Sequence, residues 1–249
     1  MDFLGEVLGW YTDPAQWTGR DTLLQLAAGH VALSAASLAL ALLLAMPIGL
    51  YIGHTGRGAQ AAVAISNIGR AVPSLGWMGI AYPITTGLFQ RAGSGFLPGL
   101  IALTLLAIPP IVTNTYTGLR EVDADLQEAG RGVGMGELQL LRKVEVPVAL
   151  PVIMAGIRSS AVAVVATAPL MSLVGADTLG SYILAGLRLS DEVQVFAAAL
   201  LVVLAALLTE FGFAWLERRA TSPGLDRSGR RLLGETGQLP VTQRPADEG

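Results

Sequence analysis

The chain contains no cysteine, and it has few charged residues. Lys, Arg, Asp and Glu make up only 14% of its 249 residues, whereas 52% are hydrophobic. The absence of cysteine excludes disulfides and thiol chemistry, and it leaves the redox compartment undetermined. Because roughly a quarter of the residues of an average soluble domain are charged, this composition excludes an ordinary soluble domain.

Histidine and lysine are also scarce, with two histidines and one lysine. The two histidines, His30 and His54, flank opposite ends of one apolar run, and no aspartate lies inside a predicted span. An intramembrane protease would need a serine with a nearby histidine, or two membrane aspartates. The sequence therefore predicts no catalytic residue and no metal site on this chain.

Long uncharged runs dominate what is present. They cover Val31–Gly53, Ala71–Gln90, Ala92–Leu119 and Val193–Thr209, which are 23, 20, 28 and 17 residues long. A membrane-spanning helix needs about 20 apolar residues. We therefore predict an all-α, multi-span membrane protein with five transmembrane helices, at about residues 31–52, 59–82, 97–116, 152–176 and 193–216.

Two of these predicted spans contain an arginine. Arg70 divides the second span, so a span from Arg70 to Gln90 that follows an interfacial helix remains an alternative. Arg158 lies near the start of the fourth span, where a long side chain reaches the headgroups.

The distribution of positive charge predicts the orientation of the chain. Loops rich in Lys and Arg remain in the cytoplasm, and five spans place eleven such residues on one side against three on the other. The first group is Arg57, Arg120, Arg131, Arg142, Lys143, Arg218, Arg219, Arg227, Arg230, Arg231 and Arg244; the second is Arg20, Arg91 and Arg188. We expect the N-terminus outside and the C-terminus inside.

Three parts of the chain follow from this topology. Residues 1–29 form an external N-terminal segment with an interfacial helix, residues 30–219 a transmembrane domain, and residues 220–249, which lack periodicity, a disordered cytoplasmic tail. Trp10, Tyr11 and Trp17 fit an outer aromatic belt and Trp215 an inner one. Packing within a short external helix is an equal alternative for Trp10 and Tyr11.

The cytoplasmic loop 121–150 is rich in glycine, which raises the question of a phosphate site. A Walker loop requires a glycine directly before its lysine, but Lys143, the only lysine, follows Arg142, and the dinucleotide pattern G-x-G-x-x-G fails as well. The loop instead predicts two short helices. Asp125 and Glu128 have the spacing of a helix start, and Gly134 and Gly136 fit a turn.

The second short helix of this loop has Glu137 in its first turn and Arg142 and Lys143 in its last turn, as the helix dipole favours. Pro147 and Pro151 are predicted to end it and to lead into the fourth span. The sequence thus predicts a helix-turn-helix on the cytoplasmic side that is joined rigidly to the membrane domain.

The same residues resemble a known motif. Glu128, Ala129 and Gly130, then Gly134, then Val144, Val146 and Pro147 keep every interval of the pattern E-A-A-x-x-x-G followed by I-x-L-P. This pattern belongs to permeases of binding-protein-dependent ABC importers, and segments such as "LVGADTLGSYILAGL" resemble their osmoprotectant family, whose substrates include glycine betaine, choline, carnitine and proline betaine. Gly130 departs from the pattern and should loosen the first helix by up to ~1 kcal/mol.

The resemblance, which runs from about His30 to Arg219, implies a type I importer fold and a set of partners. The loop 123–147 would dock on a dimer of ATPase subunits that bind ATP and Mg, so no cofactor is expected on this chain. A second permease copy or a paralogue and a periplasmic or lipid-anchored binding protein would complete the complex in the bacterial inner membrane, and no nucleic acid is expected. The residues implied in coupling are Leu126, Glu128, Ala129, Gly130, Arg131, Gly134, Met135, Val144 and Pro147.

The translocation path is predicted only from polar groups inside the spans, which are costly unless they are paired or face a cavity. These groups are Ser74, Asn114, Thr115, Thr167 and Ser172. The alternative is that the hydroxyls bond to their own helices and that Asn114 bridges neighbouring helices. Pro109, Pro110, Pro169 and Glu210 similarly fit either a path or packing. The external amphipathic piece "SYILAGLRL" fits a gate, a binding-protein surface or an interfacial helix.

Other classes of function agree less well with the sequence. An amino-acid permease of the methionine type also has five spans and is the alternative within transport. A secondary transporter does not need the cytoplasmic loop and should show internal repeats, which the sequence lacks. A purely structural scaffold would leave the motif unexplained.

Overall fold

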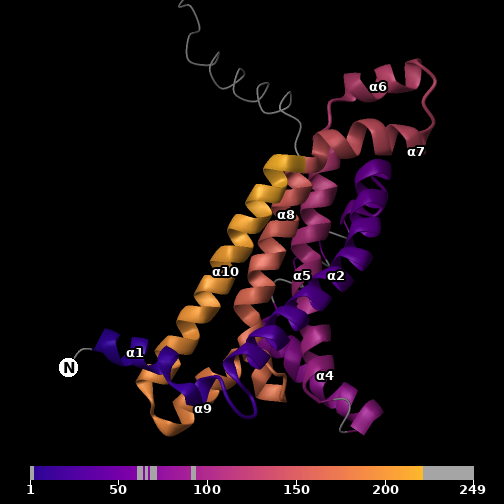
Figure 1. The fold of residues 1–249 in the computed structure, drawn as a ribbon. Helices are drawn as coiled ribbons and strands as arrows, with labels where there is room; N and C mark the ends of the chain where they lie inside the picture. The colour runs from indigo at the N-terminus through magenta and orange to yellow at the C-terminus, as the bar shows by residue number, and fades with distance from the viewer. Residues whose placement is uncertain (1–2, 61–63, 65–66, 68–71, 91–93, 221–249) are drawn as a thin grey trace, which may run out of the picture.

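The computed structural model describes residues 3–60, 64, 67, 72–90 and 94–220, and all regular elements among them are helices (Figure 1). Four of them lie along the axis of the bundle, and short helices cap both of its ends. The elements are α1 (Phe3–Thr12), η1 (Pro14–Gln16), α2 (Leu23–Thr55), α4 (Ser74–Phe89), α5 (Phe96–Arg120), α6 (Ala124–Gly132), α7 (Glu137–Leu140), the π-helical turn η3 (Leu141–Glu145), α8 (Val146–Thr167), η4 (Ala168–Val174), α9 (Gly180–Leu189) and α10 (Glu192–Ala220).

Four of the predicted spans coincide with helices that are long and apolar enough to cross a membrane. These helices are α2, α5, α10 and the continuous helical segment Glu137–Val174. Each begins before the predicted span, by one residue in α5 and α10 and by several residues in the other two.

The second predicted span, residues 59–82, is wrong as a single helix. Val72 and Pro73 are not helical, and α4 begins only after them and runs for 16 residues to Phe89. A proline disfavours the helical conformation of the residue before it. The observed start therefore lies closer to the alternative span Arg70–Gln90; residues 61–63, 65, 66 and 68–71 lie outside the described residues.

The core of the bundle forms where α2, α5 and α8 pack together. Its buried side chains are mostly small, and glycines stand where two helices meet most closely: a Cβ on Gly49 would lie 2.7 Å from Thr115 Cβ, and one on Gly156 would lie 2.5 Å from Asn114 Cβ. Small residues let helix backbones approach each other in the absence of a strong hydrophobic driving force between helices.

The prolines within the spans have packing roles in this structure. Helix α5 continues through Pro109 and Pro110, and the hydroxyl of Ser160 in α8 donates to the carbonyl of Ala107, two residues before the pair, at 3.0 Å. This bond joins α8 to α5 beside the prolines, whereas the carbonyls that lose an intrahelical donor to them are those of Leu105 and Leu106. Pro169 stands near the start of η4, where α8 tightens into a 3₁₀ helix.

Arg158 and Glu210 also have local partners. The Arg158 guanidinium in α8 lies 3.5 Å from Glu210 and 3.2 Å from Glu217, both in α10. Arg158 therefore forms an ion pair between helices, and its contact with the headgroups stays a prediction. This pair favours the structural interpretation of Glu210 over a role in the path.

The aromatic residues of α1 pack against neighbouring aromatic side chains. Trp10 is buried and stacks edge-to-face on Tyr11 and on Tyr182 of α9, and the Tyr11 hydroxyl donates to the carbonyl of Ala197 at 2.7 Å. The packing alternative therefore holds for Trp10 and Tyr11. Trp17 is exposed, as an outer belt would require.

More arginines lie at one end of the bundle than at the other. The loop helices α6 and α7 lie at the same end as the C-terminus of α10, and α1, α9 and α4 lie at the other (Figure 1). Arg120, Arg131 and Arg218 thus share one end, whereas Arg188 ends α9 at the opposite end. Of the predicted tail, Ala220 ends α10, and residues 221–249 lie outside the described residues.

Candidate coupling site

The first helix of the loop 121–150 begins two residues earlier than the sequence predicts. Asp123 caps α6 with its side chain, which accepts a hydrogen bond from the backbone N–H of Asp125 at 2.9 Å. Asp125 is thus a residue of the first turn and not the cap, and the predicted pairing of Asp125 with Glu128 is wrong. An Asp cap satisfies one of the free N–H groups at a helix start.

The turn after α6 depends on one glycine. Gly134 has a φ of +85°, a left-handed conformation in which a side chain would be strained, so this part of the prediction is confirmed. The Met135 N–H then donates back to the carbonyl of Gly130 at 3.1 Å. Gly136 has φ −72° and ψ 159°, which most residues adopt, so the predicted conformational need for a second glycine is wrong.

The second loop helix does not end at Pro147 or Pro151. Helical structure is continuous from Glu137 into the membrane domain, through α7, η3 and α8. The π-helical turn η3 ends at Glu145, and Pro147 is the second residue of α8, where a missing N–H is tolerated. The loop is therefore joined to the fourth span by one uninterrupted helical segment.

Gly130 is a contact position rather than a weak point in α6. Gly130 is buried, and a Cβ added to it would lie 2.6 Å from Cδ1 of Leu140, which is fully buried in α7. The two loop helices therefore approach each other at this glycine. The predicted loosening of the helix is opposed by a packing contact that only a residue without a side chain permits.

The outer surface of the loop is unusually apolar. Leu126 is 47% exposed, Val133 76% and Leu138 60%, although all three lie at the charged end of the bundle. A cavity of about 510 Å³ lies beside Leu138, between Gly136 and Lys143. Exposed apolar side chains that are surrounded by polar residues are typical of protein–protein contact sites.

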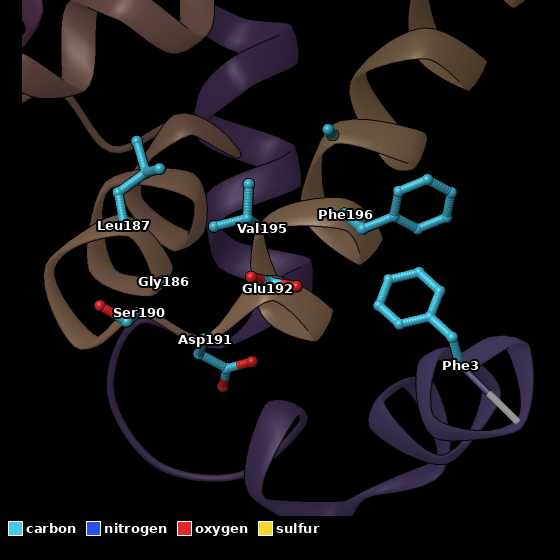
Figure 2. A pocket seen from close by; sticks show the side chains of 9 residues that line it. Phe3, Gly186, Leu187, Ser190, Asp191, Glu192, Val195 and Phe196 are labelled. Carbon is cyan, nitrogen blue, oxygen red and sulfur yellow. The ribbon is translucent and has the colours of Figure 1, made fainter. Parts of the chain in front are cut away.

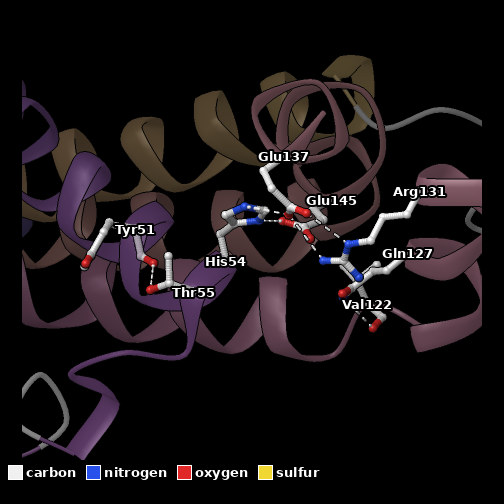
Figure 3. A network of polar contacts seen from close by, with 8 residues as sticks. All are labelled: Tyr51, His54, Thr55, Val122, Gln127, Arg131, Glu137 and Glu145. Atoms are coloured by element: carbon white, nitrogen blue, oxygen red, sulfur yellow. Dashed lines mark hydrogen bonds and ion pairs between the residues drawn. The ribbon is translucent and has the colours of Figure 1, made fainter. Parts of the chain in front are cut away.

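The charged residues of this surface fix the two loop helices to each other. Arg131 donates to both carboxylate oxygens of Glu137, at 3.1 and 3.3 Å, and the two side chains point toward each other in Figure 3. This hydrogen bond raises the pKa of the Arg131 guanidinium above its usual value. The pair spans the turn and supports the fold of the loop from outside.

The remaining predicted coupling residues are divided between this surface and the interior. Glu128, Ala129 and Pro147 are exposed, whereas Met135 and Val144 are half-buried. Val133 and Leu138 were not predicted as contacts. Each continues a helically spaced apolar series, with Leu126 and Ala129 for Val133 and with Leu141 and Val144 for Leu138, and this spacing was a signal for them. The structure thus brings the motif together into one compact helical hairpin with an exposed apolar face.

Comparison with known proteins places this fold in a family. Residues 41–222 match the family model of the binding-protein-dependent transport system inner membrane component. The chain belongs to this family. It is a permease subunit of an ABC transporter and not itself an enzyme, and its family implies an ATPase partner and a substrate-binding protein.

Characterised relatives of this permease cover most of its length. It is 35% identical to the choline transport system permease protein OpuBB of Bacillus subtilis over 80% of this chain and 88% of the relative. It is 38% identical to the carnitine transport permease protein OpuCB of Listeria monocytogenes (77% and 85%) and to the osmoprotectant import permease protein OsmY of Salmonella typhimurium (79% and 81%).

Solved structures show the same fold. The MetNI methionine ABC transporter in an inward-facing conformation matches with a TM-score of 0.72 at 23% identity, over 85% of this chain and 100% of that chain. An amino acid ABC transporter crystallised with histidines matches with a TM-score of 0.68 at 17% identity. At these identities the likeness shows the fold alone, and it confirms the predicted importer permease fold.

The predicted path residues of the permease do not gather at one place. Asn114 donates to the carbonyl of Pro110 in its own helix at 2.8 Å, and Thr115 is fully buried against Met46. Ser74 begins α4 and Thr167 ends α8, both half-buried. Both residues have partners within the protein, but not those that the alternative named: Asn114 bonds within its own helix and the Thr115 hydroxyl bonds to α2. The path itself stays a prediction.

Ser172 does lie in a cluster of hydroxyl groups. Its Oγ lies 2.7 Å from the Thr178 hydroxyl and accepts from Ser181 at 3.2 Å, so η4 is fixed to the start of α9. Sequence reasoning missed Thr178 and Ser181 because the hairpin between η4 and α9 has no local pattern that predicts it.

The opposite end of the permease has a cavity of about 580 Å³ between α1, α9 and α10 (Figure 2). Phe3 and Phe196 pack edge-to-face on one side of it, with ring centroids 5.3 Å apart, and Asp191 and Glu192 lie on the other. The predicted amphipathic piece is helix α9, whose Leu187 and Leu189 are exposed.

Proposed function

We propose that this permease moves an osmoprotectant of the betaine, choline or carnitine type into the cytoplasm, driven by a separate ATPase. The observation that carries the proposal is the identity of 35–38% with permeases for choline, carnitine and osmoprotectants, over more than three quarters of the chain. The methionine alternative rests on structures at 23% identity or less, which speak only for the fold.

We further propose that the chain lies in the bacterial inner membrane with the loop 121–150 in the cytoplasm. The concentration of arginines at the loop end supports this orientation, because positively charged loops are retained inside. Two permeases, as two copies or as a pair of paralogues, would then stand on a dimer of ATPases that binds ATP and Mg. The binding protein would meet the end formed by α1, α4 and α9.

The exposed apolar face of the loop is the proposed ATPase contact. Val133 is 76% exposed in the part of the chain that the structure describes, and burial of apolar groups such as this one drives most protein association. Movement of the ATPase dimer would be transmitted along the continuous helical segment from Glu137 into α8. This segment, rather than a proline-ended link, supports rigid transmission.

Co-purification tests the contact. We expect Val133→Asp to abolish co-purification of the ATPase subunit with the permease. Leu189→Asp is a matched control, because Leu189 is 75% exposed but lies at the opposite end. Equal recovery of the ATPase with both variants would contradict the proposed contact.

Uptake into vesicles tests the substrate class. The permease, its ATPase and its binding protein are reconstituted, and uptake of labelled choline, glycine betaine, carnitine and methionine is compared. We expect uptake of at least one quaternary ammonium compound and none of methionine. Uptake of methionine alone would favour the alternative.

A further inference from the structure

His54, at the cytoplasmic end of α2, contacts the coupling loop directly. Its Nδ1 lies 2.6 Å from Oε2 of Glu145 in η3, and its Nε2 lies 3.4 Å from Oε2 of Glu137 at the start of α7. Figure 3 shows dashed lines from the ring to both carboxylates, which lie beside each other. Because an ionised carboxylate only accepts hydrogen bonds, Nδ1 donates to Glu145.

Glu145 is buried in a way that distinguishes it from the other charged residues. It is 2% exposed, and among the described residues no other Asp, Glu, Lys or Arg side chain is buried. Glu145 is the last residue of the π-helical turn η3 and is the buried residue of that turn. A carboxylate in such a place is costly unless it is paired, and His54 is the partner that it has.

The contact joins parts of the chain that are far apart in the sequence. His54 and Glu145 are separated by 91 residues. Glu137 in turn accepts from Arg131 in α6. One row of charged groups therefore connects α6, α7, α2 and η3 at the cytoplasmic end of the bundle.

Apolar contacts reinforce the same connection. Met46 and Leu50 of α2 pack with Leu141 of η3 against the buried cluster around Leu119 and Ile153. Helix α2 therefore shares a buried cluster with the loop near its C-terminal end, and His54, one turn after Leu50, adds the direct contact with Glu145.

We propose that His54 is a positioning residue for coupling: through Glu145 it fastens the end of α2 to the coupling loop, so that the loop moves α2 together with α8. This inference rests on the proposed function. Two packed helices that are fixed to one moving element shift as a unit, whereas a helix that only touches it can slide. Without the link, movement of the loop enters the bundle only through α5 and α8, the two helices to which the chain joins it.

Transport per ATP hydrolysed tests the link. In the reconstituted complex with ATPase and binding protein, we expect His54→Gln to lower the amount of substrate transported per ATP about fivefold or more. ATP hydrolysis itself should continue, because the loop still docks. His54→Lys places another nitrogen donor beside Glu137 and Glu145 and should recover most of the ratio.

Thr55→Ala is the matched control at the same helix end. The Thr55 hydroxyl donates to Tyr51 of its own helix at 2.7 Å, so its loss should leave the ratio unchanged. The inference is overturned if His54→Gln transports as much per ATP as the wild type. It is also overturned if hydrolysis and transport fall in parallel, since this would indicate a merely structural role.

A thiol pair provides a second test, because the chain has no cysteine of its own. In His54→Cys/Glu145→Cys, a short bis-maleimide should join the two positions, as detected by mass spectrometry of the linked peptides, and should restore the transport ratio that the unlinked variant loses. Thr55→Cys/Glu145→Cys should link far less. Absence of a link between positions 54 and 145, or a link without recovery, would refute the proposal.

The two hypotheses fail in different ways. If the proposed function is wrong, the wild-type complex shows neither stimulated ATP hydrolysis nor uptake, while the cross-link between positions 54 and 145 still forms. If only the further inference is wrong, the wild type transports, and His54→Gln either matches it or loses hydrolysis and transport in parallel.

Discussion

The contact between Gly130 and Leu140 leads to a prediction that separates packing from helix propensity. In Gly130→Ala, the new methyl group would lie 2.6 Å from Leu140 Cδ1. Overpacking of a filled interior costs about 1–3 kcal/mol, and alanine in a helix gains up to ~1 kcal/mol over glycine. We therefore expect a net destabilisation of the loop by about 0–2 kcal/mol, although alanine is the residue that the motif prefers.

Shortening Leu140 should relieve this strain. Leu140→Val removes the carbon that the new methyl group would meet and, alone, should cost about 1 kcal/mol as a smaller core side chain. The two destabilisations should not add in the double variant. Its destabilisation should be smaller than the sum of the two single values by about 1–2 kcal/mol. Hydrogen exchange of the α6 amides in the detergent-solubilised permease reports the free energy of local opening.

Gly132→Ala is the matched control for this measurement. Gly132 also lies in α6, but a Cβ there would meet nothing within 4 Å. Gly132→Ala should raise the free energy of local opening of α6 by up to ~1 kcal/mol and so slow hydrogen exchange. The reasoning is refuted if Gly130→Ala slows exchange as much as Gly132→Ala, or if the effects at positions 130 and 140 add.

Three further substitutions test the membrane domain by thermal unfolding in detergent. Arg158→Met should lower the midpoint, because Glu217 loses its cation at 3.2 Å; an unchanged midpoint would mean that lipid or water already solvates both groups. Gly156→Val should prevent close packing of α8 on α5 and strongly reduce the folded yield, and normal yield would contradict the close contact. Ser160→Ala leaves the carbonyl of Ala107 without its 3.0 Å donor and should cost about 1 kcal/mol, whereas Ser160→Thr should retain part of the bond.

The sequence was sufficient to predict the spans that are set by local composition. The apolar runs behind α2, α5 and α10 are long enough to cross a bilayer, and no distant contact is needed to make them helical. The turn at Gly134 was predictable for the same reason, since a left-handed residue requires glycine locally. The second span was not, because Pro73 interrupts its apolar run.

The details of the candidate site depend on contacts between distant residues. The burial of Glu145 follows from a π-helical turn and from His54, which lies 91 residues away. The need for glycine at position 130 follows from Leu140 across the turn, which the motif alone does not reveal. Spacing along one helix cannot predict either feature, because both arise where separate elements meet.

ATP-dependent uptake by a complex altered only at Gly134 tests the central claim most directly. Gly134→Leu places a side chain at a φ of +85° and should distort the loop without touching the membrane domain. In vesicles with internal ATPase and ATP and external binding protein, the wild type should accumulate a labelled betaine or choline, and Gly134→Leu should not. Uptake that continues in Gly134→Leu at the wild-type rate, or that proceeds in the wild type without ATP, would contradict the account.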